Sequence, residues 1–369
     1  MSIDTNKTIK IAGAGISGMT AAIVLAKAGR NVEIYEKADM SGKRFQGDFQ
    51  GIENWTRKED VLDFMRKIGL EINFNYKAVD NFILMGPENT RATINSKKPI
   101  LYLVKRGAEE GSLDRGIELQ IKNHHNIKIF YNSPITDLQS VDIVATGPVF
   151  NSLDIDAFAA GYTFNTEAAD QAVLILNDEL AKDGYSYFVV FNGSGVIISC
   201  FFYSRKNMNR LADYKEKTLK FCQENFSFSM QNVKNFSGTG NVFLSKNKSN
   251  RKIYIGEAGG YQDFLFGFGM RTAMITGFLA AKSILEKEDF YKLVAKEINP
   301  YLKASISSRF LYSMLGNTSY KILIKRFINK ADPAETLAVF YGPSLLKKVI
   351  YPFARLYYFK YLRDPRKTL

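Results

Sequence analysis

The first 36 residues change from an apolar run to a helical pattern and then to strict alternation. Residues 9–12 are mostly apolar, three glycines follow, and the next apolar residues are spaced as on one face of a helix up to Gly29. Residues 31–35 then alternate between apolar and polar positions and end at Glu36. This order predicts a strand, a glycine-rich turn, a helix and a second strand.

The three glycines, Gly13, Gly15 and Gly18, form a GxGxxG motif at the first strand-to-helix turn. In such a motif the first glycine permits the tight turn, the second lets the backbone approach a pyrophosphate, and the third lets the helix lie close to the strand. The helix start adds free N–H groups and partial positive charge. Glu36 stands where a ribose needs an acceptor, so the site suits FAD or NAD rather than NADP. The alternative is a glycine-rich turn that binds nothing.

The pattern continues as strands and helices in alternation up to about residue 150. Residues 58–69 and 112–122 have the apolar spacing of amphipathic helices, and Ser112 is suited to cap the second of these. Residues 76–104 form short apolar runs broken by turn residues, typical of strands, while 127–130 and 141–147 predict two more strands. The β-α-β order predicts a parallel sheet.

Three further apolar runs, residues 171–176, 185–191 and 195–203, are separated by Asp183-Gly184 and Asn192-Gly193. Runs of this kind joined by tight turns predict an antiparallel sheet, which would be a second subdomain. Residues 209–226 then have a helical pattern.

A second glycine cluster follows a short strand at residues 252–256. Gly256 and Glu257 precede Gly259 and Gly260, and Gly267 and Gly269 lead into a long apolar helix at 269–285. This arrangement predicts another phosphate-and-sugar site at a helix start. An NAD enzyme does not need it, whereas FAD has a ribityl chain that wants an acceptor and a pyrimidine end that favours a positive dipole.

The C-terminal region has helical apolar spacing and most of the excess positive charge. The 369-residue chain has a formal net charge of +13, and residues 301–369 contain 13 Lys and Arg against 3 Asp and Glu, a net +10. Its last helix, kinked by Pro352, interleaves aromatic and basic residues: Phe353, Tyr357, Tyr358, Phe359 and Tyr361 with Arg355, Lys360 and Arg363. This composition favours an anionic membrane surface. The alternative is a helical subdomain with a basic solvent face; no nucleic-acid-binding module accompanies the charge.

The composition and the hydropathy of the chain bear on metal binding and on location in the cell. Two cysteines and two histidines fit no metal spacing, so no metal is expected. There is no signal segment and no window of membrane-spanning length without charge. We therefore expect a cytoplasmic protein, either free or attached to the cytoplasmic membrane face.

Five motifs resemble the geranylgeranyl reductase family of flavoproteins, within the wider fold group of p-hydroxybenzoate hydroxylase. They are GAGISG at 13–18 with Glu36, Arg106 before a helix, residues 141–147 ending in Ala-Thr-Gly, GEAGG at 256–260, and GYSYFVV at 184–190. Glu257 stands where the family usually has Asp, and Tyr187 stands where it has Trp. The resemblance covers roughly residues 8–290.

The resemblance implies an α/β fold with a Rossmann-like FAD-binding domain, an antiparallel-sheet substrate domain and a helical C-terminal region. The expected boundaries are 1–75, 105–150 and 251–290 for the FAD-binding domain, 76–104 and 151–250 for the substrate domain, and 291–369 for the C-terminal region. The candidate cofactor-binding residues are Gly13, Ala14, Gly15, Ile16, Ser17, Gly18, Glu36, Lys37, Arg44, Arg106, Gly147, Gly256, Glu257, Gly267, Gly269 and Met270.

The substrate side is predicted from aromatic residues. Tyr185, Tyr187, Phe264 and Phe266 are candidates for an apolar slot, with core filling as the alternative. Asp263 is the one polar candidate for catalysis, with a loop-capping role as the alternative.

The resemblance implies hydride transfer from reduced flavin N5 to a C=C bond of an isoprenoid or other lipid-like substrate. The alternatives are a flavin-dependent monooxygenase or hydroxylase of an apolar or aromatic substrate, and a non-enzymatic flavin-binding membrane protein. The electron donor, either NAD(P)H or a ferredoxin-like protein, is left open.

Overall fold

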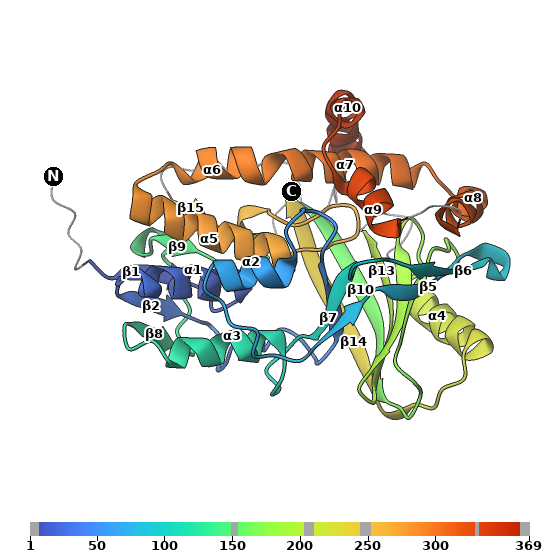
Figure 1. Cartoon of the computed structure of the whole chain (residues 1–369), viewed down its shortest axis with the longest axis horizontal. Coiled ribbons are helices and arrows are strands. Elements are labelled where there is room, and N and C mark those ends of the chain that lie inside the picture. Colours follow the sequence, from blue (N-terminus) through green and yellow to red (C-terminus); the bar gives the residue numbers. More distant parts are fainter. Residues whose placement is uncertain (1–6, 149–153, 203–209, 244–251, 329–331, 362–369) are drawn as a thin grey trace.

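The computed structural model describes residues 7–148, 154–202, 210–243, 252–328 and 332–361. A parallel sheet with its helices lies at one end of the molecule and a large, mostly antiparallel sheet at the other, and C-terminal helices run along one side of both (Figure 1). Tyr203, predicted in a strand, and Arg363, predicted in the last helix, lie outside the described residues. The same holds for the side chains of Phe359, Lys360 and Tyr361.

The parallel sheet is built around the first strand of the chain. Its strand order is β15-β9-β1-β2-β8, and every neighbouring pair is parallel, which confirms the predicted Rossmann-like sheet. The bounds are β1 (Ile9–Ala12), β2 (Val32–Tyr35), β8 (Ile127–Phe130), β9 (Ile143–Val144) and β15 (Ile253–Tyr254).

Four helices accompany this sheet: α1 (Ile16–Lys27), α2 (Val61–Lys67), α3 (Leu113–Lys122) and α5 (Met270–Glu286). The Ser112 side chain accepts a hydrogen bond from the Arg115 N–H, so Ser112 caps α3 as predicted. α5 packs directly on α1: a Cβ added at Gly277 would lie 2.4 Å from the backbone oxygen of Ser17. The start of α1 is therefore enclosed by the later parts of the chain.

The large sheet has seven strands in the order β14-β10-β13-β12-β11-β5-β6. Neighbouring pairs are antiparallel except β11 and β5, which are parallel and join the residue 76–104 region to the later strands. The bounds are β5 (Asn81–Met85), β6 (Arg91–Asn95), β10 (Asp154–Asn165), β11 (Gln171–Ile175), β12 (Tyr185–Phe191), β13 (Ser194–Phe202) and β14 (Gln231–Phe243).

The hairpin between β12 and β13 turns at Asn192-Gly193, as predicted. Both residues have left-handed φ angles, 49° and 72°, which a two-residue hairpin turn of this handedness requires. The two long strands β10 and β14 were not predicted. β14 contains mostly Asn, Gly, Ser and Lys, so it lacks the apolar alternation by which strands are recognised in a sequence.

Different elements pack on the two faces of the seven-stranded sheet. Helix α4 (Leu211–Asn225) covers one face, where the rings of Phe201 and Tyr214 lie 5.5 Å apart. The other face, which carries Tyr187, packs on a three-stranded sheet of order β3-β7-β4 through residues such as Phe49 and Leu103. That sheet consists of β3 (Phe49–Glu53), β4 (Tyr76–Val79) and β7 (Leu101–Lys105).

The C-terminal part is helical, as predicted: α6 (Phe290–Glu297), α7 (Asn299–Ser313), α8 (Asn317–Ile328), α9 (Pro333–Tyr341) and α10 (Leu345–Tyr361). Short 3₁₀ helices occur at η1 (Pro87–Asn89), η2 (Leu138–Ser140) and η4 (Gly256–Gly259). Within the described ranges, no helix has both the length and the apolar character needed to cross a membrane.

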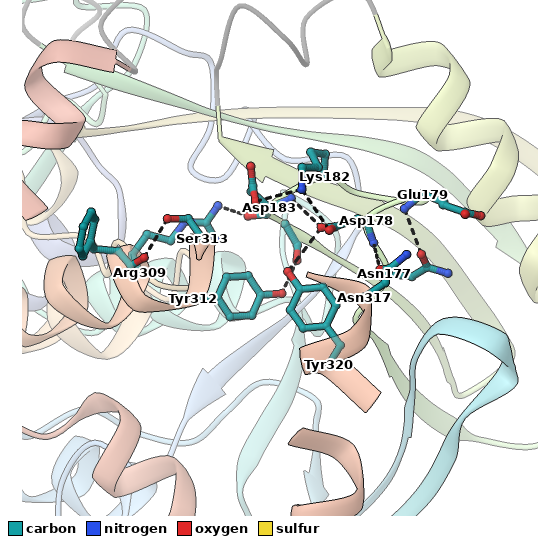
Figure 2. Close-up of polar contacts among 12 residues, drawn as sticks. Asn177, Asp178, Glu179, Lys182, Asp183, Arg309, Tyr312, Ser313, Asn317 and Tyr320 are labelled. Atoms are coloured by element: carbon teal, nitrogen blue, oxygen red, sulfur yellow. Dashed lines mark hydrogen bonds and ion pairs between the residues drawn. The ribbon is translucent and has the colours of Figure 1, made fainter. Parts of the chain in front are cut away.

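Buried polar contacts join these helices to the loop between β11 and β12 (Figure 2). Arg309 of α7 is 2% exposed and donates to the carbonyls of Asp183 and Leu265. The Tyr312 hydroxyl donates to the Gly184 carbonyl over 2.6 Å. Because a buried guanidinium left without acceptors is costly, these contacts make α7 an integral part of the fold.

Candidate functional site

The turn between β1 and α1 is shaped by three glycines that differ in what surrounds them. A Cβ at Gly13 would lie 2.3 Å from the Ala145 oxygen, and one at Gly18 would lie 2.1 Å from the Gly13 oxygen. A Cβ at Gly15 would meet no atom within 4 Å. Close packing therefore requires glycine at positions 13 and 18, whereas Gly15 faces open space that a phosphate group of a ligand can enter.

Helix α1 presents its N-terminus to this open space. Gly15 is its N-cap residue, Ile16 and Ser17 begin the helix, and its first turn contains no acidic residue. The first N–H groups of a helix have no acceptor within the helix. Together with the helix dipole, they make this end of α1 suited to an anionic group.

Glu36 lies beside the same turn at the end of β2. Its two carboxylate oxygens accept the N–H groups of Ala14, over 2.8 Å, and Ala38, over 2.9 Å. A carboxylate has more acceptor positions than these two bonds use. The arrangement holds an acceptor next to the glycine turn, and Lys37 beside it is exposed.

The second glycine cluster lies against the first. Gly256, which begins η4 just after β15, has a φ of +58°, and a Cβ there would lie 2.6 Å from the Ser17 Oγ. The Glu257 carboxylate forms a 2.7 Å ion pair with Arg44. Gly147 lies near the same guanidinium: a Cβ added there would lie 3.7 Å from the Arg44 Nη1. Two clusters 240 residues apart in sequence thus line one continuous region.

The start of α5 forms the far end of that region. Gly269 is the N-cap of α5, Met270 is its first residue, and Gly267 has a φ of +78°. The Gln262 amide nitrogen donates to the Gly267 carbonyl over 3.1 Å. Its amide oxygen is buried and has no hydrogen-bond partner among the described residues. A buried acceptor beside a helix N-terminus would be satisfied by a ligand N–H or O–H group.

Arg106 is buried between β7 and α3. Its guanidinium makes two bonds to Asp114, of 2.8 and 2.9 Å, and a third to Gln50, and the Phe45 ring centroid lies 3.7 Å from its Cζ. These contacts hold the side chain in place. The expected contact between Arg106 and the cofactor stays a prediction.

Three of the four aromatic residues expected at the substrate come together. Tyr185 and Tyr187 are stacked 6.2 Å apart on β12, and Tyr185 lies 5.2 Å from the Phe266 ring and donates to the Phe266 carbonyl. Phe264 belongs to another cluster, where its ring lies 4.7 Å from Tyr358 of α10. Burial raises the pKa values of Tyr185 and Tyr187 well above their ordinary range, so both hydroxyls are neutral.

Asp263, the candidate for catalysis, organises the loop that carries these aromatic residues. Its carboxylate accepts the N–H groups of Leu265 and Phe266 over 3.1 and 2.8 Å. Burial raises the pKa of this carboxyl despite those bonds. The loop-capping alternative accounts for its contacts, and a catalytic role stays a prediction.

A small cavity between the end of β3, the start of α5 and α7 was not predicted. The polar residues that line it include Glu53, Arg57, Asp263, Arg271 and Tyr341. Glu53 is 3% exposed, and neither its Oε2 nor the Tyr341 hydroxyl has a hydrogen-bond partner among the described residues. Burial raises the pKa of Glu53 to about 7, while Arg271 opposes the shift. The cavity brings together residues more than 200 positions apart, which local patterns do not reveal.

In the described part of the chain, His, Cys, Asp and Glu side chains form no group of three that could hold a metal ion. Burial raises the pKa of Cys200, which is close to Tyr185, to about 12. A thiol in this state is a poor nucleophile.

Comparison with known proteins agrees with this description. A family model described as an NAD(P)-binding Rossmann-like domain matches residues 11–51. A curated relative, an L-amino-acid oxidase from Echis ocellatus, is 34% identical over 85 residues, which is 20% of this chain and 17% of that protein. The chain therefore matches only about a sixth of that relative's length.

Solved structures match almost the whole chain. A geranylgeranyl bacteriochlorophyll reductase-like protein from Thermoplasma acidophilum has a TM-score of 0.69 at 16% identity, covering 95% of this chain and 98% of that one. The flavin-dependent brominase Bmp2 has a TM-score of 0.63 at 13% identity, and the match covers 95% of this chain and 99% of that one. The p-nitrophenol 4-monooxygenase PnpA from Pseudomonas putida has a TM-score of 0.57 at 13% identity, and the match covers 98% of this chain and 100% of that one. The chain has the fold of these proteins. The predicted resemblance is thereby confirmed for the fold.

The three glycines of the first turn allow a matched test. We expect Gly15→Val to fold but to lose FAD, the cofactor expected from the sequence, because the new side chain enters open space that the pyrophosphate would use. Gly18→Ala should lower the free energy of unfolding, since its Cβ would collide with the Gly13 oxygen. Urea unfolding and flavin content of both purified variants check this. Full flavin content in Gly15→Val would contradict it.

The pKa of Glu53 predicts a pH dependence of stability. Because the folded-state value is raised to about 7 from about 4.5, the folded form binds more protons than the unfolded form between these values, and stability falls as pH rises through that window. The fall is at most about 3 kcal/mol. Glu53→Gln should remove it.

Urea unfolding at pH values below and above this window measures the effect. The exposed Glu335→Gln substitution on α9 is the control and should leave the pH dependence of the wild type unchanged. Parallel pH profiles for Glu53→Gln and the wild type would contradict the assignment.

Proposed function

We propose that the protein is an FAD-dependent oxidoreductase that reduces C=C bonds of an isoprenoid or other lipid-like apolar substrate. The observation that supports this most is the junction of the two glycine clusters, where Gly256 lies against Ser17 at the start of α1. A nicotinamide dinucleotide needs only the first cluster. A longer cofactor with a ribityl chain and a ring system would use both.

The residues present fit FAD along this region. The open side of Gly15 and the first N–H groups of α1 would hold the pyrophosphate, and Glu36 the adenosine ribose. Glu257 would accept from the ribityl chain, and the N-terminus of α5 at Gly269 and Met270 would face the pyrimidine end. When bound, FAD supplies a ring that accepts and donates hydride equivalents.

The chain's own residues suit an uncharged substrate beside that ring. Tyr185, Tyr187 and Phe266 form an aromatic group on the sheet face that packs towards the three-stranded sheet. Their burial keeps the phenols neutral, so the group favours apolar chains, while a charged substrate would lose its hydration there. Reduction of an alkene also needs a proton, and Asp263, whose buried carboxyl has a raised pKa, is the candidate donor. The likeness to the Thermoplasma protein, which is named as reductase-like, agrees with this choice.

A flavin-dependent monooxygenase or hydroxylase is the second candidate. It is favoured by the likeness over 98% of this chain to a protein named as a p-nitrophenol monooxygenase. An aromatic group of this kind suits an aromatic substrate as well as an isoprenoid. A flavin-binding protein without catalytic activity is the third.

A substrate dissolved in lipid also requires access to a membrane. We therefore extend the proposal to an enzyme that works on the cytoplasmic face of a membrane and receives electrons from NAD(P)H or a ferredoxin-like protein.

We expect the purified protein to be yellow and to release FAD on denaturation. Under argon, the reduced protein should be reoxidised by lipids with unsaturated isoprenoid chains, and mass spectrometry should show products two hydrogens heavier. Oxygen-dependent turnover with an added oxygen atom would favour the monooxygenase instead. A denatured supernatant without FAD, or one with only NAD, would contradict both.

Glu257 and Arg44 give a second test of the cofactor site. If Glu257 accepts from the ribityl chain, Glu257→Ala should weaken FAD binding by roughly 1–3 kcal/mol, the cost of losing a buried hydrogen bond. Arg44→Ala removes the same ion pair but keeps the carboxylate, so it should weaken FAD binding less. Titration of the apoprotein with FAD compares the two. Equal losses in both variants would mean that only the ion pair matters.

A further inference from the structure

Helix α10 carries a row of large apolar side chains on its outer side. Its members, here called the exposed stripe, are Leu345 (80% exposed), Leu346 (64%), Val349 (63%), Phe353 (67%) and Leu356 (66%). At about 100° per residue, these five positions fall within an arc of about 100° around the helix. Single exposed apolar residues are ordinary, but a continuous row marks an interaction surface.

The opposite side of α10 is firmly seated on the protein. Ala354 and Tyr358 are fully buried, and the Tyr358 ring contacts Phe264. The Ser307 hydroxyl of α7 donates to the Lys347 carbonyl over 2.8 Å, while the Lys347 ammonium donates to three carbonyls around the end of α9. The stripe is therefore held outward by the packing of the other face.

The arrangement of the helix in space leaves the stripe accessible. α10 stands out from the layer formed by α6 and α7, at the edge of the molecule (Figure 1). Nothing else in the described part of the chain covers these five side chains, as their exposure shows.

Positive charge accompanies the stripe. The sequence from residue 345 to 369 contains seven Lys and Arg and one Asp. Lys348 and Arg355 are exposed, and both fall on one flank of the stripe's arc. A second copy of this chain docked face to face would bring these like charges together. An anionic lipid surface would instead match both the apolar row and the charge.

We propose that α10 lies in the surface of an anionic membrane, with the exposed stripe among the acyl chains and Lys348 and Arg355 at the headgroups. The expected aromatic set is corrected in one respect: Tyr358 faces the protein and cannot contact lipid. Phe353 remains outside, joined by four aliphatic residues. Membrane contact does not depend on the redox chemistry proposed above. Vesicle binding and alkene reduction are therefore tested independently of one another.

The test is co-sedimentation of the full-length protein with phosphatidylcholine vesicles that contain or lack phosphatidylglycerol. We expect binding to the anionic vesicles that weakens with added salt. Phe353→Glu combined with Leu356→Glu should lower the partition coefficient roughly tenfold or more, since two apolar anchors become charges that the surface repels. Val233→Glu, at an exposed apolar position on β14, is the matched control and should bind as the wild type does.

A second variant separates charge from apolar contact. Lys348→Glu with Arg355→Glu should remove the preference for anionic vesicles. Circular dichroism verifies that each variant is folded. Binding of the stripe variant equal to that of Val233→Glu would overturn the proposal. It would also be overturned if sedimentation velocity showed a dimer that the stripe variant abolishes, because the stripe would then join two copies.

Discussion

The close approach of backbones around the first turn of α1 is the constraint on which the rest of the structure depends. Gly13 lies against Ala145 of the segment after β9, and Gly18 lies against Gly13. From the other side, Gly277 of α5 and Gly256 after β15 both lie against Ser17. A side chain at any of these four glycines would collide with its neighbour. Residues from three distant segments therefore converge on one helix N-terminus, and the side of Gly15 is left open.

That convergence explains how a parallel sheet and a large antiparallel sheet can share one site. The loop after β15 passes from Gly256, beside Ser17, through Asp263 to Phe266, beside Tyr185 of the seven-stranded sheet. Asp263 holds the loop by accepting two backbone N–H groups. The loop thus fixes the distance between the glycine turn and the aromatic group. The buried guanidinium of Arg309 donates to the Leu265 carbonyl of this loop, and Arg271, at the start of α5, donates to the carbonyls of Glu53 and Glu59.

Local patterns predicted the parts of the fold whose causes are local. The GxGxxG turn, the Ser112 cap and the Asn192-Gly193 hairpin each depend on a few adjacent residues, and all are present. Strand β14 was missed because its pairing with β10, rather than its own apolar alternation, makes it a strand. The Arg44–Glu257 pair and the Glu53 cavity were missed for a related reason: each joins segments about 200 residues apart. The aromatic loop shows the same limit, since its sequence does not reveal that Phe264 and Phe266 belong to different clusters.

Phe264 and Phe266 pack in different clusters and so link helix α10 to the candidate substrate face. Phe266 packs on Tyr185, at the candidate substrate face, whereas Phe264 packs on Tyr358, at the inner side of α10. Both are held by one loop, whose N–H groups bind the Asp263 carboxylate and the Ser305 hydroxyl of α7. The outward stripe of α10 is therefore only a few packed side chains from the aromatic group. In the proposal, the membrane contact at α10 and the candidate substrate face are thus linked through this one loop.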